Sequence, residues 1–202
     1  MPWEKTGMVV LQAESEVASI NMVYGGAATG KKVMTSSSSP GMSLMQEGVT
    51  YLAGAELPCL LVNVMRGGPG LGTIQPSQAD YFQTVKGGGH GDYQLYTLAP
   101  ASVQEMYDFV FKAWDIAFKY RNPVMILSDG AIGQVMEKVY VGDYVPRWTD
   151  EEIAKNAPWA AFGKPAHRDH NIVTSLELDS SKQEKNNHRF QAKYRDMEKN
   201  DT

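Results

Sequence analysis

Short apolar runs alternate with longer stretches of helical periodicity along most of the chain. In these stretches apolar residues recur every three or four positions, as on the buried face of a helix. The runs that fit buried strands are Met8–Leu11, Lys32–Met34, Cys59–Met65, Tyr93–Leu98 and Val124–Leu127, and the helical stretches are Glu14–Ala28, Ser43–Ala55 and Ser102–Tyr120. This alternation predicts an α/β fold in which a mostly parallel sheet is covered by helices.

The last of these helices has a recognisable start. Ser102 is followed three residues later by Glu105, a capping box in which the serine and glutamate side chains each accept a backbone N–H group. We therefore expect the helix to begin at Ser102.

The distribution of charged residues changes near Pro146–Asp150. Charged residues make up 21% of the chain but are concentrated beyond this point, whereas every glycine except Gly163 lies before it. We therefore expect an α/β domain over residues 1–149 and a polar, charged connecting segment or interface arm over residues 150–202. Its end, Ser180–Thr202, has too few apolar residues to fold alone and is expected to be a solvated helix or a connecting segment.

Composition excludes several classes of protein. Apolar residues make up 43% of the 202 residues, but no apolar run approaches the roughly 18 residues of a membrane span. The net charge of −4 argues against a nucleic-acid-binding surface. A single cysteine, Cys59, forms neither an internal disulfide nor a thiolate metal cluster, and the pair His167 and His170 is too sparse for a metal site. These features predict a soluble protein of the reducing cytoplasm that holds no metal of its own.

Residues that follow strands are candidates for ligand binding, because ligands of such sheets bind outside the carboxyl ends of the strands. The hydroxyl-rich segment Thr35–Ser39, which includes Ser36, is either a well-capped turn or an anion cradle at a helix start. Arg66, followed by Gly67 and Gly68, suits a small carboxylate, which a guanidinium binds with two parallel hydrogen bonds. An ion pair at an interface is the alternative for Arg66.

A second glycine cluster, Lys86–Asp92, contains His90. The cluster is either a flexible lid or a packed bend. His90 is either a general acid–base group or a side chain that only forms hydrogen bonds.

Two carboxylates, Glu14 and Glu16, open the first predicted helix. Acidic residues at this position commonly complement the helix dipole. Glu16 also leads into the apolar pair Val17 and Ala18, so a functional carboxylate in a partly apolar setting is a second interpretation.

Seven motifs occur in a fixed order along the chain. They are Gln12–Ala18 (QAESEVA), Thr35–Gly41 (TSSSSPG), Asn63–Gly72 (NVMRGGPGLG), Gln75–Asp80 (QPSQAD), Lys86–Asp92 (KGGGHGD), Ala99–Glu105 (APASVQE) and Arg121–Met125 (RNPVM). From about Val9 to Val139, this series closely resembles the alpha subunit of 2-oxoacid:ferredoxin oxidoreductases, and most closely the branched-chain 2-oxoisovalerate type. The resemblance implies the fold of the pyrimidine-binding domain of a thiamine-diphosphate enzyme.

The resemblance also implies an activity and roles for individual residues. Enzymes of this family oxidatively decarboxylate a 2-oxoacid to an acyl-coenzyme A and pass two electrons through iron–sulfur clusters to ferredoxin. Glu16 then corresponds to the acid that bonds N1′ of the aminopyrimidine and shares a proton with it. Arg66 corresponds to the residue that binds the carboxylate of the 2-oxoacid. Residues expected to line the site or a subunit interface are Thr35, Ser36, Gly67, Gly68 and His90.

The remaining parts of the site are expected on other chains of a hetero-oligomer. The diphosphate and magnesium belong to a beta subunit and the clusters to an iron–sulfur subunit, with coenzyme A as co-substrate. Family alpha subunits begin earlier and continue into a second α/β domain, so the chain is expected to be truncated at both ends and inactive alone. The alternative is a non-catalytic remnant or scaffold that pairs with a beta subunit. The ordered motifs disfavour an unrelated α/β module that binds a small carboxylate or phosphate.

Overall fold

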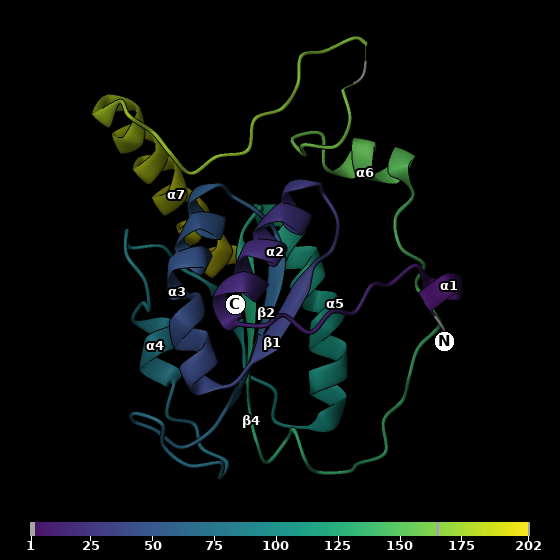
Figure 1. Cartoon of the computed structure of the whole chain (residues 1–202), viewed down its shortest axis with the longest axis vertical. Coiled ribbons are helices and arrows are strands. Elements are labelled where there is room, and N and C mark those ends of the chain that lie inside the picture. The colour runs from purple at the N-terminus through teal and green to yellow at the C-terminus, as the bar shows by residue number, and fades with distance from the viewer. Residues whose placement is uncertain (1–2, 165, 202) are drawn as a thin grey trace.

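A four-stranded parallel sheet lies at the centre of the fold (Figure 1). The computed structural model describes residues 3–164 and 166–201. The strands are β1 (Met34–Ser37), β2 (Cys59–Met65), β3 (Tyr96–Leu98) and β4 (Pro123–Asp129), and their spatial order is β1-β2-β4-β3. Because all neighbouring strands are parallel, their carboxyl ends meet at one edge of the sheet. The predicted α/β fold with a mostly parallel sheet is therefore confirmed.

Helices cover both faces of this sheet. The helices of the described chain are α1 (Trp3–Thr6), α2 (Glu16–Ala28), α3 (Ser39–Gly54), α4 (Tyr81–Val85), α5 (Val103–Tyr120), α6 (Asp150–Asn156) and α7 (Ser180–Asn200). α2 and α3 lie on one face and α5 lies on the other (Figure 1). No helix among the described residues combines the length and apolarity that crossing a membrane requires.

The predicted start of helix α5 is confirmed, because Ser102 is its N-cap residue, but only half of the expected capping box forms. Ser102 Oγ accepts the N–H group of Glu105 at 3.1 Å. The Glu105 carboxylate accepts the N–H group of Ala101 at 2.7 Å, one residue before the cap.

Side chains of the central strand β2 alternate between two hydrophobic cores. Cys59, Leu61 and Met65 pack with α2 and α3, whereas Leu60 and Val62 pack with α5. A continuous apolar run of this kind is typical of a parallel strand that is covered on both sides. Cys59 is fully buried, and this burial raises the pKa of its thiol.

The predicted strand at Met8–Leu11 is wrong. The segment has no regular secondary structure, and its side chains are exposed, from 61% for Met8 to 78% for Val10. An apolar run becomes a strand only where a neighbouring strand pairs with its backbone, and the edge strand β1 pairs only with β2 in the described chain.

Other predicted elements form with different bounds. β1 is Met34–Ser37 instead of Lys32–Met34, β3 covers only the second half of Tyr93–Leu98, and β4 extends beyond Val124–Leu127 at both ends. α2 begins at Glu16 instead of Glu14, and α3 begins at Ser39 instead of Ser43.

Helix α7, predicted as a solvated helix or a connecting segment, packs onto the α5 side of the sheet near its C-terminal end. Most of its side chains are exposed, but Tyr194 and Met197 are buried in the core beneath α5. Asp201, just beyond the helix, forms an ion pair of 2.7 Å with Lys119 of α5. Thr202 lies outside the described residues. The division of the chain at residue 150 stays a prediction.

A cluster of charged side chains joins α7 to the end of α3. The Glu56 carboxylate pairs with Arg189 and, at 3.3 Å, with Lys193. Burial alone would raise the pKa of Glu56, but the Arg189 hydrogen bond and the two positive charges outweigh it and hold the pKa below its usual value. Burial, together with repulsion from Arg189 and Arg121, lowers the pKa of Lys193 despite the attraction of Glu56. The single carboxylate of Glu56 therefore balances the positive charges of both Arg189 and Lys193.

Replacing Glu56 by glutamine is expected to destabilise the fold by about 3 kcal/mol at neutral pH, because the buried Lys193 ammonium loses its carboxylate. The folded-state pKa of Glu56 lies below the unfolded value of about 4.3. Its contribution is therefore full above about pH 4.3 and is lost as the pH falls through the folded-state value. Urea unfolding at neutral pH and at about pH 3 measures the effect. A stability difference between Glu56→Gln and the wild type that persists undiminished at the lower pH would contradict it.

Candidate functional site

The carboxyl edge of the sheet gathers polar side chains from three neighbouring strands. β1 ends at Ser37, Arg66 follows β2, and β4 ends at Asp129. The register pairs Ser37 with Asn63 and Met65 with Asp129, so these strand ends lie side by side. α3 begins directly after the carboxyl end of β1, so its first turn lies at this edge. α2 ends shortly before β1 starts and runs in the opposite direction to the strand, so the first turn of α2 lies at this edge as well.

Glu16 lies in the first turn of α2, which Ser15 caps by accepting the N–H group of Ala18 at 3.2 Å. Its half-buried side chain lies against the first turn of α3. A Cβ atom on Gly41 would lie 2.8 Å from Glu16 Cγ, 2.9 Å from Glu16 Oε1 and 2.0 Å from Ser37 Oγ. Within the described part of the chain, the Glu16 carboxylate forms no hydrogen bond or ion pair. It is therefore available to a ligand.

Close packing of α2 on α3 brings Glu16 to this position. Gly48 of α3 faces Ile20 of α2, and a Cβ atom on Gly48 would lie 2.5 Å from Ile20 Cγ2. The absence of a side chain at Gly48 therefore allows the two helices to approach one turn after Glu16.

Gly41→Ala is expected to displace the Glu16 side chain, because the added methyl group overlaps Ser37 Oγ and crowds Glu16 Oε1. Overpacking of this kind costs about 1–3 kcal/mol, which lowers the Tm by at least about 2 °C in a chain of this size. Thermal unfolding measures the change. The matched control is Gly25→Ala in α2, whose added methyl group meets nothing within 4 Å. It should raise the Tm, because alanine favours a helix, and an unchanged Tm for Gly41→Ala would contradict the prediction.

The hydroxyl-rich segment has three side chains without a hydrogen-bond partner among the described residues, those of Ser36, Ser37 and Ser38. Thr35 Oγ1 and Ser19 Oγ of α2 are hydrogen-bonded at 2.7 Å, which ties β1 to α2. Ser38 is the N-cap residue of α3, but its side chain makes no capping hydrogen bond. Of the two interpretations of this segment, side-chain capping is therefore not what the structure shows.

Arg66 is half-buried and holds the loop that follows it. Its Nη1 donates to the carbonyl oxygens of Leu71 at 2.8 Å and Thr73 at 3.2 Å. Its Nε and Nη2 form no hydrogen bond to any part of the chain that the structure describes. One edge of the guanidinium therefore fixes the loop, and the other edge can form two parallel hydrogen bonds to a carboxylate.

The glycines after Arg66 have different surroundings. The N–H group of Gly67 donates to the Gln75 carbonyl at 3.0 Å, and its carbonyl accepts the N–H group of Thr73 at 2.8 Å. A Cβ atom on Gly72, which has a φ of +64°, would lie 1.8 Å from the Gly67 oxygen, so only glycine fits there. Gly68, in contrast, has nothing within 4 Å of such an atom. The loop is thus closed on itself, with open space beside Gly68.

The segment Lys86–Asp92 is a packed bend along α3. Cβ atoms on Gly88 and Gly89 would lie 2.2 Å from Gln46 Oε1 and 2.3 Å from Thr50 Oγ1. These glycines therefore allow the backbone of the segment to lie directly on the helix.

His90 of this segment is exposed, and its ring packs edge-on against Tyr51 with 6.4 Å between ring centroids. Tyr51 lies about 15 Å along the axis of α3 from Gly41, at a rise of 1.5 Å per residue. The structure therefore does not bring His90 to Glu16. A role for His90 in the site stays a prediction.

Sequence reasoning missed a hydrogen-bond network beside Arg66. Ser39 Oγ donates to Asp80 Oδ2 at 2.6 Å and accepts the backbone N–H group of Arg66 at 3.1 Å. Asn63 donates to the same Asp80 oxygen at 2.9 Å and accepts the backbone N–H group of Ser39 at 3.2 Å. Its signal in the sequence is the single amide of Asn63 within the otherwise apolar run of β2.

The carboxylate of Asp129, at the end of β4, accepts three hydrogen bonds. Asp129 accepts hydrogen bonds from Gln78 Nε2 at 3.0 Å and from the backbone N–H groups of Ala131 at 2.8 Å and Ile132 at 3.0 Å. The Gln78 hydrogen bond, aided by the backbone donors, holds the pKa of Asp129 below its usual value. No group of three or more His, Cys, Asp or Glu side chains suited to a metal ion occurs among the described residues.

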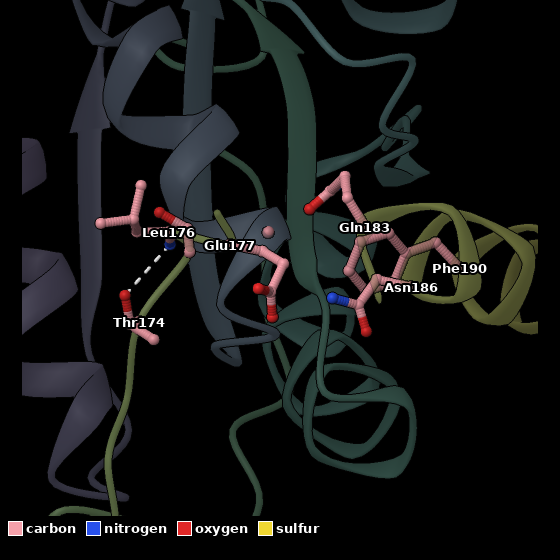
Figure 2. Close-up of a pocket in the computed structure, with 8 residues that line it drawn as sticks. Thr174, Leu176, Glu177, Gln183, Asn186 and Phe190 are labelled. Carbon is pink, nitrogen blue, oxygen red and sulfur yellow. Dashed lines mark hydrogen bonds between the residues drawn. The ribbon is translucent and has the colours of Figure 1, made fainter. Parts of the chain in front are cut away.

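The cavity drawn in Figure 2 lies at the other end of α3. Its volume is about 170 Å³, and its lining includes Gly54, the segment Thr174–Glu177 and three side chains of α7, which are Gln183, Asn186 and Phe190. Gly54 ends α3, about 20 Å along the helix axis from Gly41. This cavity is therefore separate from the site at the carboxyl edge.

A family model matches almost the whole chain. The family is described as "Pyruvate flavodoxin/ferredoxin oxidoreductase, thiamine diP-bdg", and its model covers residues 2–199. The chain belongs to this family. The assignment predicted from the ordered motifs is thereby confirmed.

Relatives within the pyruvate flavodoxin/ferredoxin oxidoreductase family include subunits of two kinds of 2-oxoacid enzyme. The chain is 50% identical over 198 residues to ketoisovalerate oxidoreductase subunit VorB of Methanothermobacter thermautotrophicus, covering 96% of this chain and 54% of the relative. It is 45% identical over 142 residues to 2-oxoglutarate synthase subunit KorA of Methanocaldococcus jannaschii, covering 70% of this chain and 38% of the relative. The chain thus spans about half the length of VorB and a smaller part of the length of KorA.

A solved structure shares the fold of this family member. It is the 2-oxoglutarate:ferredoxin oxidoreductase from Magnetococcus marinus with 2-oxoglutarate, coenzyme A and succinyl-CoA bound. The TM-score is 0.71 at 28% sequence identity, and the match covers 98% of this chain and 39% of that one. The expected thiamine-diphosphate-binding type of α/β fold agrees with this similarity.

Proposed function

We propose that this chain forms the pyrimidine-binding part of a 2-oxoacid:ferredoxin oxidoreductase, in which Glu16 serves the cofactor and Arg66 serves the substrate. The observation that carries the proposal is the Glu16 carboxylate, which is half-buried, unpaired within the described chain and placed at the same sheet edge as Arg66. The solved relative holds 2-oxoglutarate and succinyl-CoA, which differ by the loss of one carboxyl carbon and the gain of a thioester. The reaction proposed here is of the same kind: a 2-oxoacid anion, coenzyme A and two oxidised ferredoxin centres give acyl-coenzyme A, carbon dioxide, one proton and two reduced ferredoxin centres.

The Glu16 carboxylate fits an aminopyrimidine by its chemistry. A half-buried carboxylate is stabilised when a partner replaces the water it has lost, and a ring nitrogen that carries or accepts a proton is such a partner. Glu16 then holds a proton between its carboxyl oxygen and that nitrogen. Thiamine diphosphate, when bound, supplies the nucleophilic carbon and the electron sink for the decarboxylation.

Arg66 fits the carboxylate of a 2-oxoacid by its free edge. Its Nη1 is held by two carbonyl oxygens of the following loop, which fixes the plane of the guanidinium. The Nε and Nη2 edge then presents parallel donors at the end of β2, in the geometry that a carboxylate accepts. The substrate is therefore oriented before any bond is broken.

Exposed apolar side chains beside the site support a partner subunit. Leu71 and Ile74 in the loop after β2 are each 83% exposed, and Tyr81 and Phe82 at the start of α4 are 57% and 70% exposed. An apolar surface next to a polar site is typical of an interface. The proposal places the diphosphate and magnesium on a beta subunit there, the clusters on an iron–sulfur subunit, and the complex in the reducing cytoplasm.

The substrate proposed is a branched-chain 2-oxoacid of the 2-oxoisovalerate type. The chain is 50% identical to a ketoisovalerate oxidoreductase subunit and 45% identical to a 2-oxoglutarate synthase subunit, and the first match also covers more of the chain. The higher identity to the ketoisovalerate oxidoreductase subunit is what supports a branched-chain substrate.

Reconstitution tests the proposal. The chain is combined with beta and iron–sulfur subunits of this kind of enzyme, and ferredoxin reduction is measured with 2-oxoisovalerate, pyruvate and 2-oxoglutarate. We expect turnover that depends on coenzyme A and is fastest with 2-oxoisovalerate, and calorimetry should show thiamine diphosphate binding only when the beta subunit is present. Stable pairing without cofactor binding or turnover would instead identify a scaffold.

A further inference from the structure

The loop that carries Arg66 is held at both ends by one hydroxyl group. The loop leaves β2 at Arg66 and reaches α4 at Asp80, the residue before the helix. At its start, the Arg66 backbone N–H group donates to Ser39 Oγ at 3.1 Å. At its end, Asp80 Oδ2 accepts the Ser39 hydroxyl at 2.6 Å. Ser39 therefore connects the two ends of the loop to the first turn of α3.

Asn63 makes this connection rigid. Its side chain is fully buried in β2, and it bonds Asp80 Oδ2 at 2.9 Å and the Ser39 N–H group at 3.2 Å. The side chains of Ser39, Asn63 and Asp80, together with the backbone N–H group of Ser39, thus form a closed ring of hydrogen bonds. Hydrogen bonds that close such a ring restrain the backbone segments that they join.

This ring also fixes the position of Arg66 relative to Glu16. Ser39 lies two residues before Gly41, the residue against which the Glu16 side chain rests. The same first turn of α3 therefore contacts the Glu16 carboxylate on one side and holds the backbone of Arg66 on the other. A shift of this turn relative to the loop would change the separation of the two groups.

We propose that Asp80 is a positioning residue for substrate binding: by holding Ser39 and Asn63 together, it sets where the Arg66 guanidinium stands relative to Glu16. The inference rests on the proposed function, because it assigns Asp80 to the Arg66 side of that site. Among the described residues, Asp80 forms no hydrogen bond or ion pair with Glu16 or with the guanidinium, and its hydrogen bonds go to Ser39 and Asn63.

The carboxylate is suited to this task because a single oxygen accepts both hydrogen bonds. Among the described residues Asp80 has no cation as a partner, so its role does not depend on an ion pair. An asparagine in its place keeps an oxygen that accepts from Ser39 and Asn63, although charge-assisted hydrogen bonds are roughly twice as strong as neutral ones. An alanine in its place leaves both donors without an acceptor.

The test uses the reconstituted complex with Asp80→Ala and Asp80→Asn, with Asp115→Ala as a control on the exposed side of α5. We expect Asp80→Ala to raise the KM for the 2-oxoacid at least tenfold while kcat changes less than threefold. Asp80→Asn should rescue the KM to within about threefold of the wild type, and Asp115→Ala should match the wild type. A merely structural role would lower kcat and the Tm without this split or this rescue.

Amide hydrogen exchange gives a readout that does not require activity. In Asp80→Ala, the N–H groups of Arg66, Gly67 and Thr73 should exchange at least tenfold faster, because the loop loses its fixed end. Should the complex show no turnover with any 2-oxoacid, the proposed function fails, and exchange alone decides whether Asp80 holds the loop. If Asp80→Ala does not fold, Ser39→Ala carries the same expectations. Wild-type KM and wild-type exchange in Asp80→Ala, or no rescue by Asp80→Asn, would overturn the inference.

Discussion

Glu16→Gln is expected to lower the turnover of the reconstituted complex by about 10²–10⁴-fold, the range that a positioned proton-transfer group contributes. Glutamine keeps the length of the side chain and one hydrogen-bonding oxygen, but it cannot hold or release a proton at the ring nitrogen. Cofactor affinity should fall less than turnover, because part of the hydrogen bonding survives. Steady-state kinetics at saturating 2-oxoisovalerate and calorimetric titration of thiamine diphosphate measure the two effects.

The chain offers a matched control for this substitution. Glu14 lies two residues before Glu16, carries the same charge and is exposed. Glu14→Gln should leave both turnover and cofactor affinity unchanged. A Glu16→Gln complex with turnover within about threefold of the wild type would refute the assigned role.

Arg66→Ala is expected to raise the KM for the 2-oxoacid far more than it weakens the cofactor. Loss of the charge-assisted hydrogen bonds to a carboxylate costs about 2–3 kcal/mol, which is roughly a 30- to 150-fold change in KM. Arg66→Lys should recover only part of this, since an ammonium lacks the planar fork of a guanidinium. The measurement compares KM, kcat and the thiamine diphosphate affinity of both variants with those of the wild type.

The control for Arg66 is Arg195 in α7, which is exposed and forms no hydrogen bond or ion pair with the described residues. Arg195→Ala should leave all three quantities unchanged. An Arg66→Ala complex that loses cofactor and substrate affinity to the same extent would show that the residue supports the whole site instead of the carboxylate.

The local pattern of apolar residues was sufficient to predict the strand that helices cover on both sides. Cys59–Met65 is a strand over the predicted range, because an apolar run of that length between Pro58 and Arg66 has one stable environment, the centre of a parallel sheet. Met8–Leu11 is also an apolar run but lies exposed without a neighbouring strand among the described residues. Composition alone cannot distinguish these cases, since strand formation depends on a partner elsewhere in the chain.

The sequence predicted single candidate residues of the site, but it did not predict the hydrogen bonds between residues that are distant along the chain. The position of Arg66 follows from the predicted strand Cys59–Met65, and that of Glu16 follows from the predicted start of the first helix, although the strand predicted before it, Met8–Leu11, does not form. The ring of Ser39, Asn63 and Asp80 joins residues up to 41 positions apart, and no local spacing marks such a contact. Likewise, the packed bend that contains His90 depends on the surface of α3, which its own sequence does not reveal.

The buried thiol of Cys59 can be used to measure local unfolding of the sheet. It is the single cysteine of the chain and lies at the start of the central strand, fully shielded and in the unreactive protonated form. The thiolate is the nucleophile that attacks an alkylating reagent, so Cys59 is modified only after an opening of the structure around β2 exposes its sulfur to solvent. The rate of alkylation under native conditions therefore gives the free energy of that opening, residue-specifically and without an added dye.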